Sequence, residues 1–192
     1  AWVGDDDDSA LASEVAALFR EFTAAGPALY LMQGNRDFLL GAGFCDSVNG
    51  VLLDDPTVID LYGTPTLLMH GDSLCTGDAE YVAFRARARS PEWQAELLAK
   101  PLPERRALAA QLRAMSREAN SNKAEDIMDV TPSEVLRVMS EAGVGRLIHG
   151  HTHRPARHPV APGERIVLGD WDRFGWFIEA QADLLELRRF EL

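Results

Sequence analysis

Two kinds of feature are scarce in this 192-residue sequence, and each shortage excludes a class of protein. Only two cysteines occur, Cys45 and Cys75, which is too few for a disulfide framework or a cysteine-rich zinc site. We expect both to be small buried or half-buried thiols in a reducing compartment. Apolar runs are short, and none reaches the length of about 18 residues that spans a bilayer. With no basic-then-apolar signal segment either, the sequence predicts a cytosolic or peripheral protein.

Basic residues are outnumbered by acidic ones, with 19 Lys and Arg against 30 Asp and Glu and a net charge of −11. This balance argues against a general nucleic-acid-binding protein, which needs clustered cations to displace counterions from phosphates. Residues 84–123 reverse the balance with nine Lys and Arg against four Glu. This segment either faces an anionic ligand or membrane surface, or forms a solvated helix surface. The hydrophobic content of 46% is sufficient for one core, which predicts a single domain.

Three short apolar runs are each followed at once by polar residues and a glycine. Residues 28–32 lead into Gln-Gly-Asn-Arg-Asp, residues 66–69 into His-Gly-Asp, and residues 146–148 into His-Gly-His-Thr-His. Such runs are typical of buried strands, and in sheets flanked by helices ligands bind at the carboxyl ends of the strands. The three loops are therefore predicted to converge on one site.

Apolar residues at helical spacing predict helices elsewhere in the chain. Residues 9–25 form an amphipathic pattern that stops at Gly26-Pro27, and residues 133–142 form another that ends at Gly143. Residues 78–118 read as helical, with breaks at their prolines. Alternation typical of late β-strands follows at residues 165–168, 176–180 and 184–190.

The histidines of these loops are the strongest candidates for chemistry. On an extended segment residues two apart point to the same side, so His151 and His153 are predicted to reach one site while Thr152 points away. Alone, such a pair is either a metal pair or a structural, solvent-exposed one. His70 alone is more typical of a satisfied polar group, and Gly34-Asn35 alone is typical of a turn.

Taken together, the Asn and His residues favour a hydrolytic transition-metal centre. Neutral imidazoles suit Mn, Fe, Ni or Zn, whereas an amide oxygen is seldom a ligand of structural zinc. Two such metals about 3.5–4 Å apart clamp phosphoryl oxygens during in-line displacement. Arg36, directly after Asn35, would supply a fixed cation for the developing phosphoryl charge. The alternative is an ordinary salt bridge between Arg36 and Asp37.

These loops resemble the motifs of the calcineurin-like metallophosphoesterase superfamily. That superfamily carries D-x-H, G-D-x-x-[D/E], G-N-[H/R]-[D/E], H-G and G-H-x-H at successive strand ends. Gly34-Asn35-Arg36-Asp37, His70-Gly71-Asp72 and Gly150-His151-Thr152-His153 match the last three, and the first two are absent. The resemblance implies an α/β fold, a two-sheet αββα sandwich truncated at its N-terminus. It also implies a single domain over residues 1–192, with a helical cap insertion at about 78–123.

Within the superfamily, the chain is similar to the hydrolases that cleave UDP-2,3-diacylglucosamine in lipid A biosynthesis. The resemblance covers almost all of the chain. Its segments are residues 34–40, 70–76, 116–123, 127–130, 149–155 and 167–171. It implies Mn-dependent hydrolysis of UDP-2,3-diacylglucosamine to UMP and 2,3-diacylglucosamine 1-phosphate, by attack of a metal-bound hydroxide on the α-phosphorus.

The same resemblance implies roles for individual residues. Asn35, His70 and His151 would bind one Mn²⁺, His153 would bind the other, and Arg36 would be the catalytic residue on the phosphate. The implied substrate-binding residues are Asn35, Arg36, Asp78, Ser116, Asn120, Lys123 and His151. The cap would hold the acyl chains at the cytoplasmic face of the inner membrane. Neither nucleic acid nor a stable protein partner is implied.

Plainer roles are expected for several neighbouring residues. His149 is predicted to pack or to support a ligand from outside the first shell, and Asp72 is predicted to orient a ligand. His158 and Trp171 are predicted to be structural. The acidic run at residues 5–8 is predicted to be a solvated loop.

Two other functions stay open on the sequence alone. One is hydrolysis of a cyclic nucleotide or a dinucleoside polyphosphate, which would not need residues 116–123. The other is a non-catalytic scaffold, which the surviving Asn35, His70, His151 and His153 argue against. Because the second metal keeps only His153, the 192-residue chain alone is expected to be inactive and to bind at most one Mn²⁺ weakly.

Overall fold

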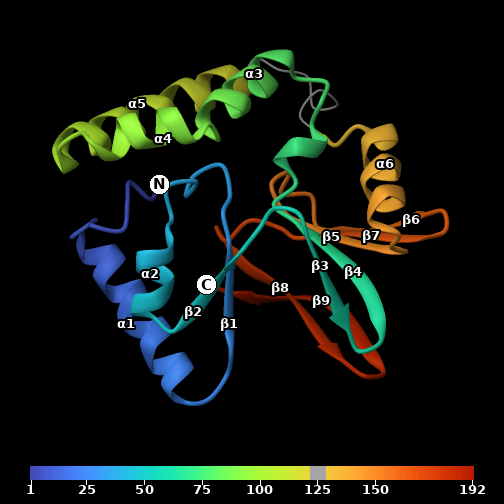
Figure 1. The fold of residues 1–192 in the computed structure, drawn as a ribbon. Coiled ribbons are helices and arrows are strands. Elements are labelled where there is room, and N and C mark those ends of the chain that lie inside the picture. The colour runs from blue at the N-terminus through green and yellow to red at the C-terminus, as the bar shows by residue number, and fades with distance from the viewer. Residues whose placement is uncertain (122–128) are drawn as a thin grey trace. The chain divides into compact units, whose positions relative to one another are not determined.

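The computed structural model describes residues 1–121 and 129–192 (Figure 1). The chain forms two compact units, each described in turn. The first consists of Ala1–Asp54 and Ala83–Lys123, and the second of Asp55–Val82 and Ala124–Leu192. The single domain with a cap insertion at about 78–123 stays a prediction, although helices fill the described part of that insertion.

The first unit begins with two helices and a two-stranded parallel sheet. Its elements are α1 (Ala10–Ala24), β1 (Leu29–Met32), α2 (Ala42–Ser47) and β2 (Gly50–Leu53). Ser9 caps α1, because its hydroxyl oxygen accepts a hydrogen bond from the Ala12 amide at 3.3 Å. Apolar side chains of α1, including Val15 and Phe19, pack against Phe44 of α2. The helix predicted at residues 9–25 and the strand at 28–32 are confirmed, whereas α2 and β2 were not predicted.

Three helices occupy the proline-punctuated segment after residue 78. They are α3 (Ala79–Ala88), α4 (Pro91–Leu98) and α5 (Leu102–Ser121). Ser90 caps α4 by accepting a hydrogen bond from the Trp93 amide at 3.3 Å, and Pro91 occupies the first turn, where its missing amide costs nothing. The predicted helical breaks are therefore confirmed. Within residues 1–121 and 129–192, no helix has both the length and the apolar character needed to cross a membrane.

The second unit contains a five-stranded mixed sheet, a hairpin and a covering helix. The sheet has the order β3-β4-β5-β7-β6. The elements of this unit are β3 (Thr57–Leu61), β4 (Thr64–Met69), the 3-10 helix η1 (Asp72–Leu74), α6 (Pro132–Ala142), β5 (Arg146–His149), β6 (Ala156–Val160), β7 (Gly163–Val167), β8 (Phe174–Gln181) and β9 (Leu184–Glu191). The central strands β4, β5 and β7 are parallel, so their carboxyl ends meet at one edge. The fold is mixed α/β, as predicted.

The core of the second unit lies between α6 and the sheet (Figure 1). Val135 and Met139, one turn apart on α6, pack with Leu67 of β4 and Leu147 of β5. All four are buried, and burying each such side chain is worth about 1.5–3 kcal/mol. Gly143 ends α6 in the left-handed conformation, as predicted. The sheet that carries the histidine loops is thereby held from one face.

The acidic run at residues 5–8 is largely exposed to solvent, as predicted, but its carboxylates also make specific contacts. Asp5 accepts hydrogen bonds from the amides of Gly41 and Phe44 at 2.8 and 2.9 Å, and so caps the first turn of α2. Asp6 forms a two-point ion pair with Arg105 of α5, at 2.7 and 2.5 Å. The run therefore fastens its own segment to α2 and α5.

Arg105 makes the largest number of these contacts with the N-terminal segment among the described residues. Its side chain is 4% exposed and also donates to the backbone oxygens of Val3 at 2.6 Å and Lys100 at 3.0 Å. Gly4 has φ +131°, and a Cβ at this position would lie 2.3 Å from Arg105 Nη1. A glycine is required here because the buried guanidinium occupies the space of a side chain.

Arg105→Gln is expected to lower the free energy of unfolding by about 2 kcal/mol, because buried carbonyl groups lose their donors. Arg106→Gln is the matched control, since Arg106 pairs with Asp7 and Asp8 from the next position of the same helix but is itself exposed. Urea unfolding of both variants measures the difference. Equal midpoints for the two variants would contradict a structural role for Arg105.

Candidate functional site

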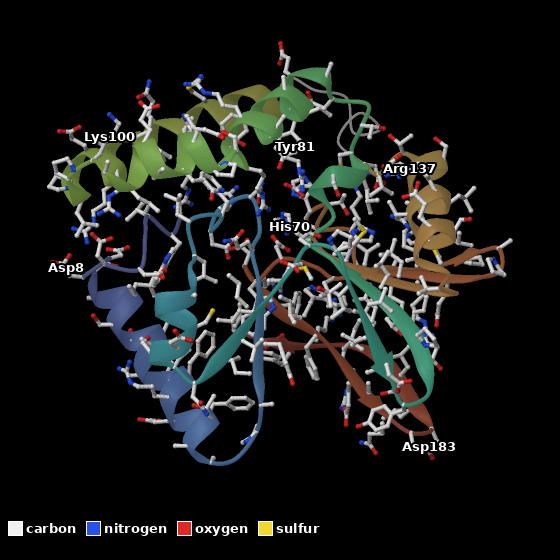
Figure 2. The ribbon with its side chains drawn as sticks, viewed as in Figure 1. Asp8, His70, Tyr81, Lys100, Arg137 and Asp183 are labelled. Atoms are coloured by element: carbon white, nitrogen blue, oxygen red, sulfur yellow. The ribbon has the colours of Figure 1, made fainter. Side chains whose placement is uncertain are left out.

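His70 and His151 lie close together because β4 and β5 are parallel neighbours. Met69 and His149, the last residues of the two strands, are register partners, so the loops begin side by side. The Gly150 amide donates a hydrogen bond to the His70 carbonyl oxygen at 3.0 Å and joins the loops. The ring centroids of His70 and His151 are 5.0 Å apart, and Figure 2 shows His70 where β4 ends. Two of the predicted metal ligands are thus brought together.

Gly71 makes the approach of the two loops possible. Its φ is +108°, and a Cβ at this position would lie 2.7 Å from Nδ1 of His149 and 3.2 Å from the Gly150 carbonyl oxygen. Both the backbone conformation and the lack of space therefore require a glycine after His70. The His-Gly pair of the sequence motif has a steric explanation in this contact.

His149 is fully buried beneath the two loops, with 1% of its surface exposed. Its Nδ1 lies 2.8 Å from the Gly150 carbonyl oxygen and its Nε2 lies 3.3 Å from Nη1 of Arg165. A carbonyl oxygen only accepts and a guanidinium only donates, so the proton sits on Nδ1 and Nε2 accepts. Burial lowers the pKa of His149 to about 4, which keeps the ring neutral. The predicted packing role of His149 is consistent with these contacts.

The loop of His151 and His153 is not the extended segment that was predicted. Both residues have a left-handed backbone, with φ +66° and +55°, and the Thr152 amide bonds back to the Gly150 carbonyl oxygen at 2.8 Å. Alternation of side chains holds only for extended backbone, so it does not place these two rings on one side. His151 is beside His70, while His153 is exposed and its Nδ1 lies 3.9 Å from Asp170 Oδ2.

Tyr81 belongs to the surroundings of His151, which the sequence did not indicate. Its ring lies 5.5 Å from that of His151, and its hydroxyl donates to Oδ2 of the buried Asp72 at 3.1 Å. Asp72 therefore positions Tyr81, which in turn packs on His151 (Tyr81 is labelled in Figure 2). One signal in the sequence could have pointed to Tyr81. Asp78 lies three residues earlier, and its carboxylate accepts a hydrogen bond from the Tyr81 amide at 3.0 Å, which marks the start of a helix.

Asn35 and Arg36 occupy a tight loop after β1 in the first unit. Asp37 does not pair with Arg36, which corrects the alternative of a salt bridge; its carboxylate accepts a hydrogen bond from the Gly34 amide at 2.5 Å. Asn35 is half-buried. Arg36 is exposed and has no ion pair within the residues that the structure describes.

The remaining predicted substrate residues are spread over the helical segment. Asp78 starts α3 and is half-buried, and Ser116 is exposed on α5. Asn120 belongs to α5 at a position whose side chain is not described, and Lys123 lies outside the described residues. Asp78 and Ser116 keep their proposed roles as predictions.

The fit of a metal ion to these residues rests on donor chemistry. The imidazoles of His70 and His151 come from joined loops, and imidazole suits a divalent transition metal. In residues 1–121 and 129–192, no group of three or more His, Cys, Asp or Glu is arranged to hold an ion. The second unit thus offers a pair of nitrogen donors, and an ion held there needs further ligands.

Fold and site together define a class of protein. A mixed α/β fold carries a His-Gly loop and a Gly-His-x-His loop at the ends of adjacent parallel strands, as in calcineurin-like metallophosphoesterases. The α/β part of the predicted fold class is confirmed, and the two-sheet sandwich stays a prediction.

Curated relatives narrow the class to one family. The chain is 58% identical over 196 residues to a UDP-2,3-diacylglucosamine hydrolase of Cellvibrio japonicus, covering 100% of this chain and 82% of the relative. It is 54% identical to the hydrolase of the same name from Marinobacter nauticus, covering 95% and 77%. For the one from Pseudomonas aeruginosa strain PAO1 the identity is 52%, covering 95% and 78%. The chain belongs to the UDP-2,3-diacylglucosamine hydrolase family, a family of enzymes.

Two further comparisons add little. No protein-family model matches the chain. Among solved structures, Vps29 with Zn²⁺ from Entamoeba histolytica aligns over 91% of this chain and 88% of its own, with 12% identity and a TM-score of 0.36. No conclusion about this chain rests on that likeness.

Gly71→Ala is expected to lower the free energy of unfolding by about 3 kcal/mol or more, because it adds both backbone strain and a clash with His149. Gly143→Ala is the control: its φ is also positive, at +65°, but nothing lies within 4 Å of an added Cβ. That variant should lose only about 1–2 kcal/mol. Thermal unfolding and UMP release are measured on both. A Gly71→Ala protein as stable as Gly143→Ala would contradict the close packing of the two loops.

Proposed function

We propose that the full-length protein containing this chain hydrolyses the pyrophosphate bond of UDP-2,3-diacylglucosamine and releases UMP and 2,3-diacylglucosamine 1-phosphate, as a step of lipid A biosynthesis. The observation that carries the proposal is the pair of His70 and His151, 5.0 Å apart on two joined loops, in a chain 58% identical to a hydrolase named for this substrate. Hydrolysis of a phosphoric anhydride requires a charged, positioned site more than a protein nucleophile.

Mn²⁺ is the proposed cofactor. Asn35, His70 and His151 would hold one ion, and His153 would contribute to a second. When bound, the ions supply Lewis-acid stabilisation of the phosphoryl oxygens and lower the pKa of water. The protein's part is to fix the donors: the hydrogen bond from Gly150 to His70 sets the spacing of the loops, and Tyr81 holds the His151 ring.

Arg36 is proposed as the catalytic cation on the phosphate. Its guanidinium is exposed and has no described carboxylate partner, while Asp37 next to it is engaged with the Gly34 amide. A guanidinium matches the geometry of phosphoryl oxygens and stabilises charge that develops on them. The loop that presents it is held by Gln33, which accepts a hydrogen bond from Arg89 at 3.1 Å and donates to the Leu40 carbonyl oxygen.

The helices α3 to α5 are proposed to bind the rest of the substrate. Asp78, Ser116, Asn120 and Lys123 would hold the glucosamine and nucleotide parts, and His151 would also contact the substrate. An aromatic cluster in the first unit supplies apolar surface for acyl chains: Trp93 lies 5.7 Å from Phe38 and 6.5 Å from Phe84, and all three are half-buried. Because such a substrate resides in a bilayer, we place the protein peripherally on the cytoplasmic face of the inner membrane.

The test is UMP release by the purified full-length protein from UDP-2,3-diacylglucosamine with Mn²⁺, compared with release after EDTA treatment. Activity should be lost in EDTA and restored by Mn²⁺. A cyclic nucleotide and a dinucleoside polyphosphate serve as competing substrates. Cleavage of either of these, with UDP-2,3-diacylglucosamine left intact, would show that the protein is a phosphoesterase with another substrate. No turnover of any of the three would favour the non-catalytic scaffold.

His70→Ala and Arg36→Ala are each expected to reduce kcat by about 10²–10³-fold, because the first removes a ligand of the proposed ion and the second removes the cation proposed to act on the reacting phosphate. Arg137→Gln is the control, since Arg137 lies on the exposed side of α6 and pairs with Glu134 and Glu141 (Figure 2). Steady-state kinetics of the three variants gives the comparison. An unchanged kcat for His70→Ala would remove this histidine from the metal site.

A further inference from the structure

A cavity of about 270 Å³ lies on the β6–β7 side of the sheet in the second unit. At about 30 Å³ for each water molecule in the liquid, its volume equals that of roughly nine waters, which is the size of a small phosphate ester. Its lining combines charged and polar side chains with apolar surface. The lining residues are Asp129, Thr152, Arg154, Pro155, Ala156, His158, Arg165 and Val167.

The strand register explains why these side chains share one face. In the antiparallel pair β6–β7, Ala156 is opposite Val167 and His158 is opposite Arg165. Successive side chains alternate between faces, so these four point to the same side. Arg157, between the two β6 positions, points to the other side, where it pairs with Glu164. The cavity is therefore built by the regular sheet and not by a loop alone.

Arg165 is the cation of this cavity that has no carboxylate hydrogen-bonded to it among the described residues. Arg154 forms an ion pair with Asp129 at 2.9 Å. Over the described ranges 1–121 and 129–192, the polar contact of Arg165 is with Nε2 of His149, a neutral acceptor. Arg165 is half-buried, and burial lowers its pKa. The charge of Asp129 partly opposes this lowering, but its carboxylate is paired with Arg154, so an anion in the cavity would supply the directly bonded counter-charge that the guanidinium of Arg165 lacks.

Two neutral donors complete the cavity wall. The hydroxyl oxygen of Thr152 is buried and makes no hydrogen bond to any described residue. His158 is half-buried, and burial together with the charge of Arg165 lowers its pKa, so it presents a neutral imidazole. The donors come from β6, from β7 and from the loop after His151, so they surround a ligand from several directions. Such an arrangement suits a tetrahedral oxyanion better than a planar carboxylate.

We propose that this cavity is a phosphate-binding site in which Arg165, Thr152 and His158 hold a phosphoryl group, free or as part of a nucleotide monophosphate. The site does not include the pair of His70 and His151. Arg165 joins the two regions, since it donates to His149, the residue directly before Gly150. The proposal does not rest on the proposed hydrolysis, because binding of a phosphoryl group here needs neither metal nor turnover.

Isothermal titration of inorganic phosphate, UMP and acetate into protein stripped of metal with EDTA and then freed of the chelator tests the site. Removing the metal ensures that phosphate does not bind at the histidine pair. Phosphate should bind at one site, and acetate at least about tenfold more weakly. UMP binding at least tenfold tighter than phosphate would assign the nucleotide as occupant, and similar affinities would assign free phosphate. Lack of saturable phosphate binding, or acetate binding as tightly as phosphate, would overturn the proposal.

Variants assign the binding to this cavity. Arg165→Gln should weaken phosphate at least about tenfold and Thr152→Val about threefold, according to the usual strengths of charged and neutral hydrogen bonds. Arg157→Gln is the control, because Arg157 is on the same hairpin but the opposite face, and Glu164 keeps Arg146 as a partner. If Arg165→Gln does not fold, Arg165→Lys and Thr152→Val decide. Unchanged affinity in the folded Arg165 and Thr152 variants would place the phosphate elsewhere.

Discussion

The parallel pairing of β4 with β5 is the constraint on which the candidate site depends. It ends both strands at one edge, with Met69 and His149 in register, and so starts two polar loops side by side. Once the loops begin together, they compete for the same space. Gly71 leaves room for both loops because it has no side chain. The hydrogen bond from the Gly150 amide to the His70 carbonyl oxygen then fixes the distance between the loops. The closeness of His70 and His151 is a consequence of sheet topology, not of their own interactions.

The buried imidazole of His149 is the second consequence of this packing. His149 is the last residue of β5 and its side chain is buried. The ring must therefore be neutral, and both of its nitrogens need hydrogen-bond partners. The Gly150 carbonyl oxygen satisfies one nitrogen and Arg165 satisfies the other. The contact with His149 holds the Arg165 guanidinium at the sheet face, where the nearby carboxylate of Asp129 is paired with Arg154. The charge left there is what connects the histidine loops to the cavity beside β6 and β7.

Local patterns predicted most of the elements, because strands and helices are set by periodicity, caps and prolines. The helix starts at Ser9 and Ser90 and the end at Gly143 are local signals of this kind. Strands β2, β3 and β6 were not predicted; β6 contains a proline, which weakens the strand pattern, and tolerates it because it is an edge strand. The loop after β5 was predicted wrongly, since the left-handed backbone of His151 and His153 follows from the packing of that loop and not from its residue types.

The candidate site was predicted unevenly for the same reason. The motif residues identified the pair of His70 and His151, but nothing local linked Tyr81 to His151, because that contact depends on where α3 begins. A count of charged residues along the sequence also cannot show which charges are paired in the fold. The basic excess counted over residues 84–123 includes Arg105 and Arg106, yet both are paired with an acidic run almost a hundred positions earlier in the chain.

This long-range pairing reduces the positive charge that the helical segment offers to a ligand or a surface. Two of its nine basic residues are neutralised by Asp6, Asp7 and Asp8, and Arg89 is engaged with Gln33. These ion pairs attach the start of α5 to the N-terminal segment, because Arg105 donates hydrogen bonds to the carboxylate of Asp6 and to the backbone oxygens of Val3 and Lys100. Attraction to an anionic surface must come from the cations that stay exposed, such as Arg113 further along α5. The attachment of α5 and any attraction to an anionic surface therefore depend on different arginines.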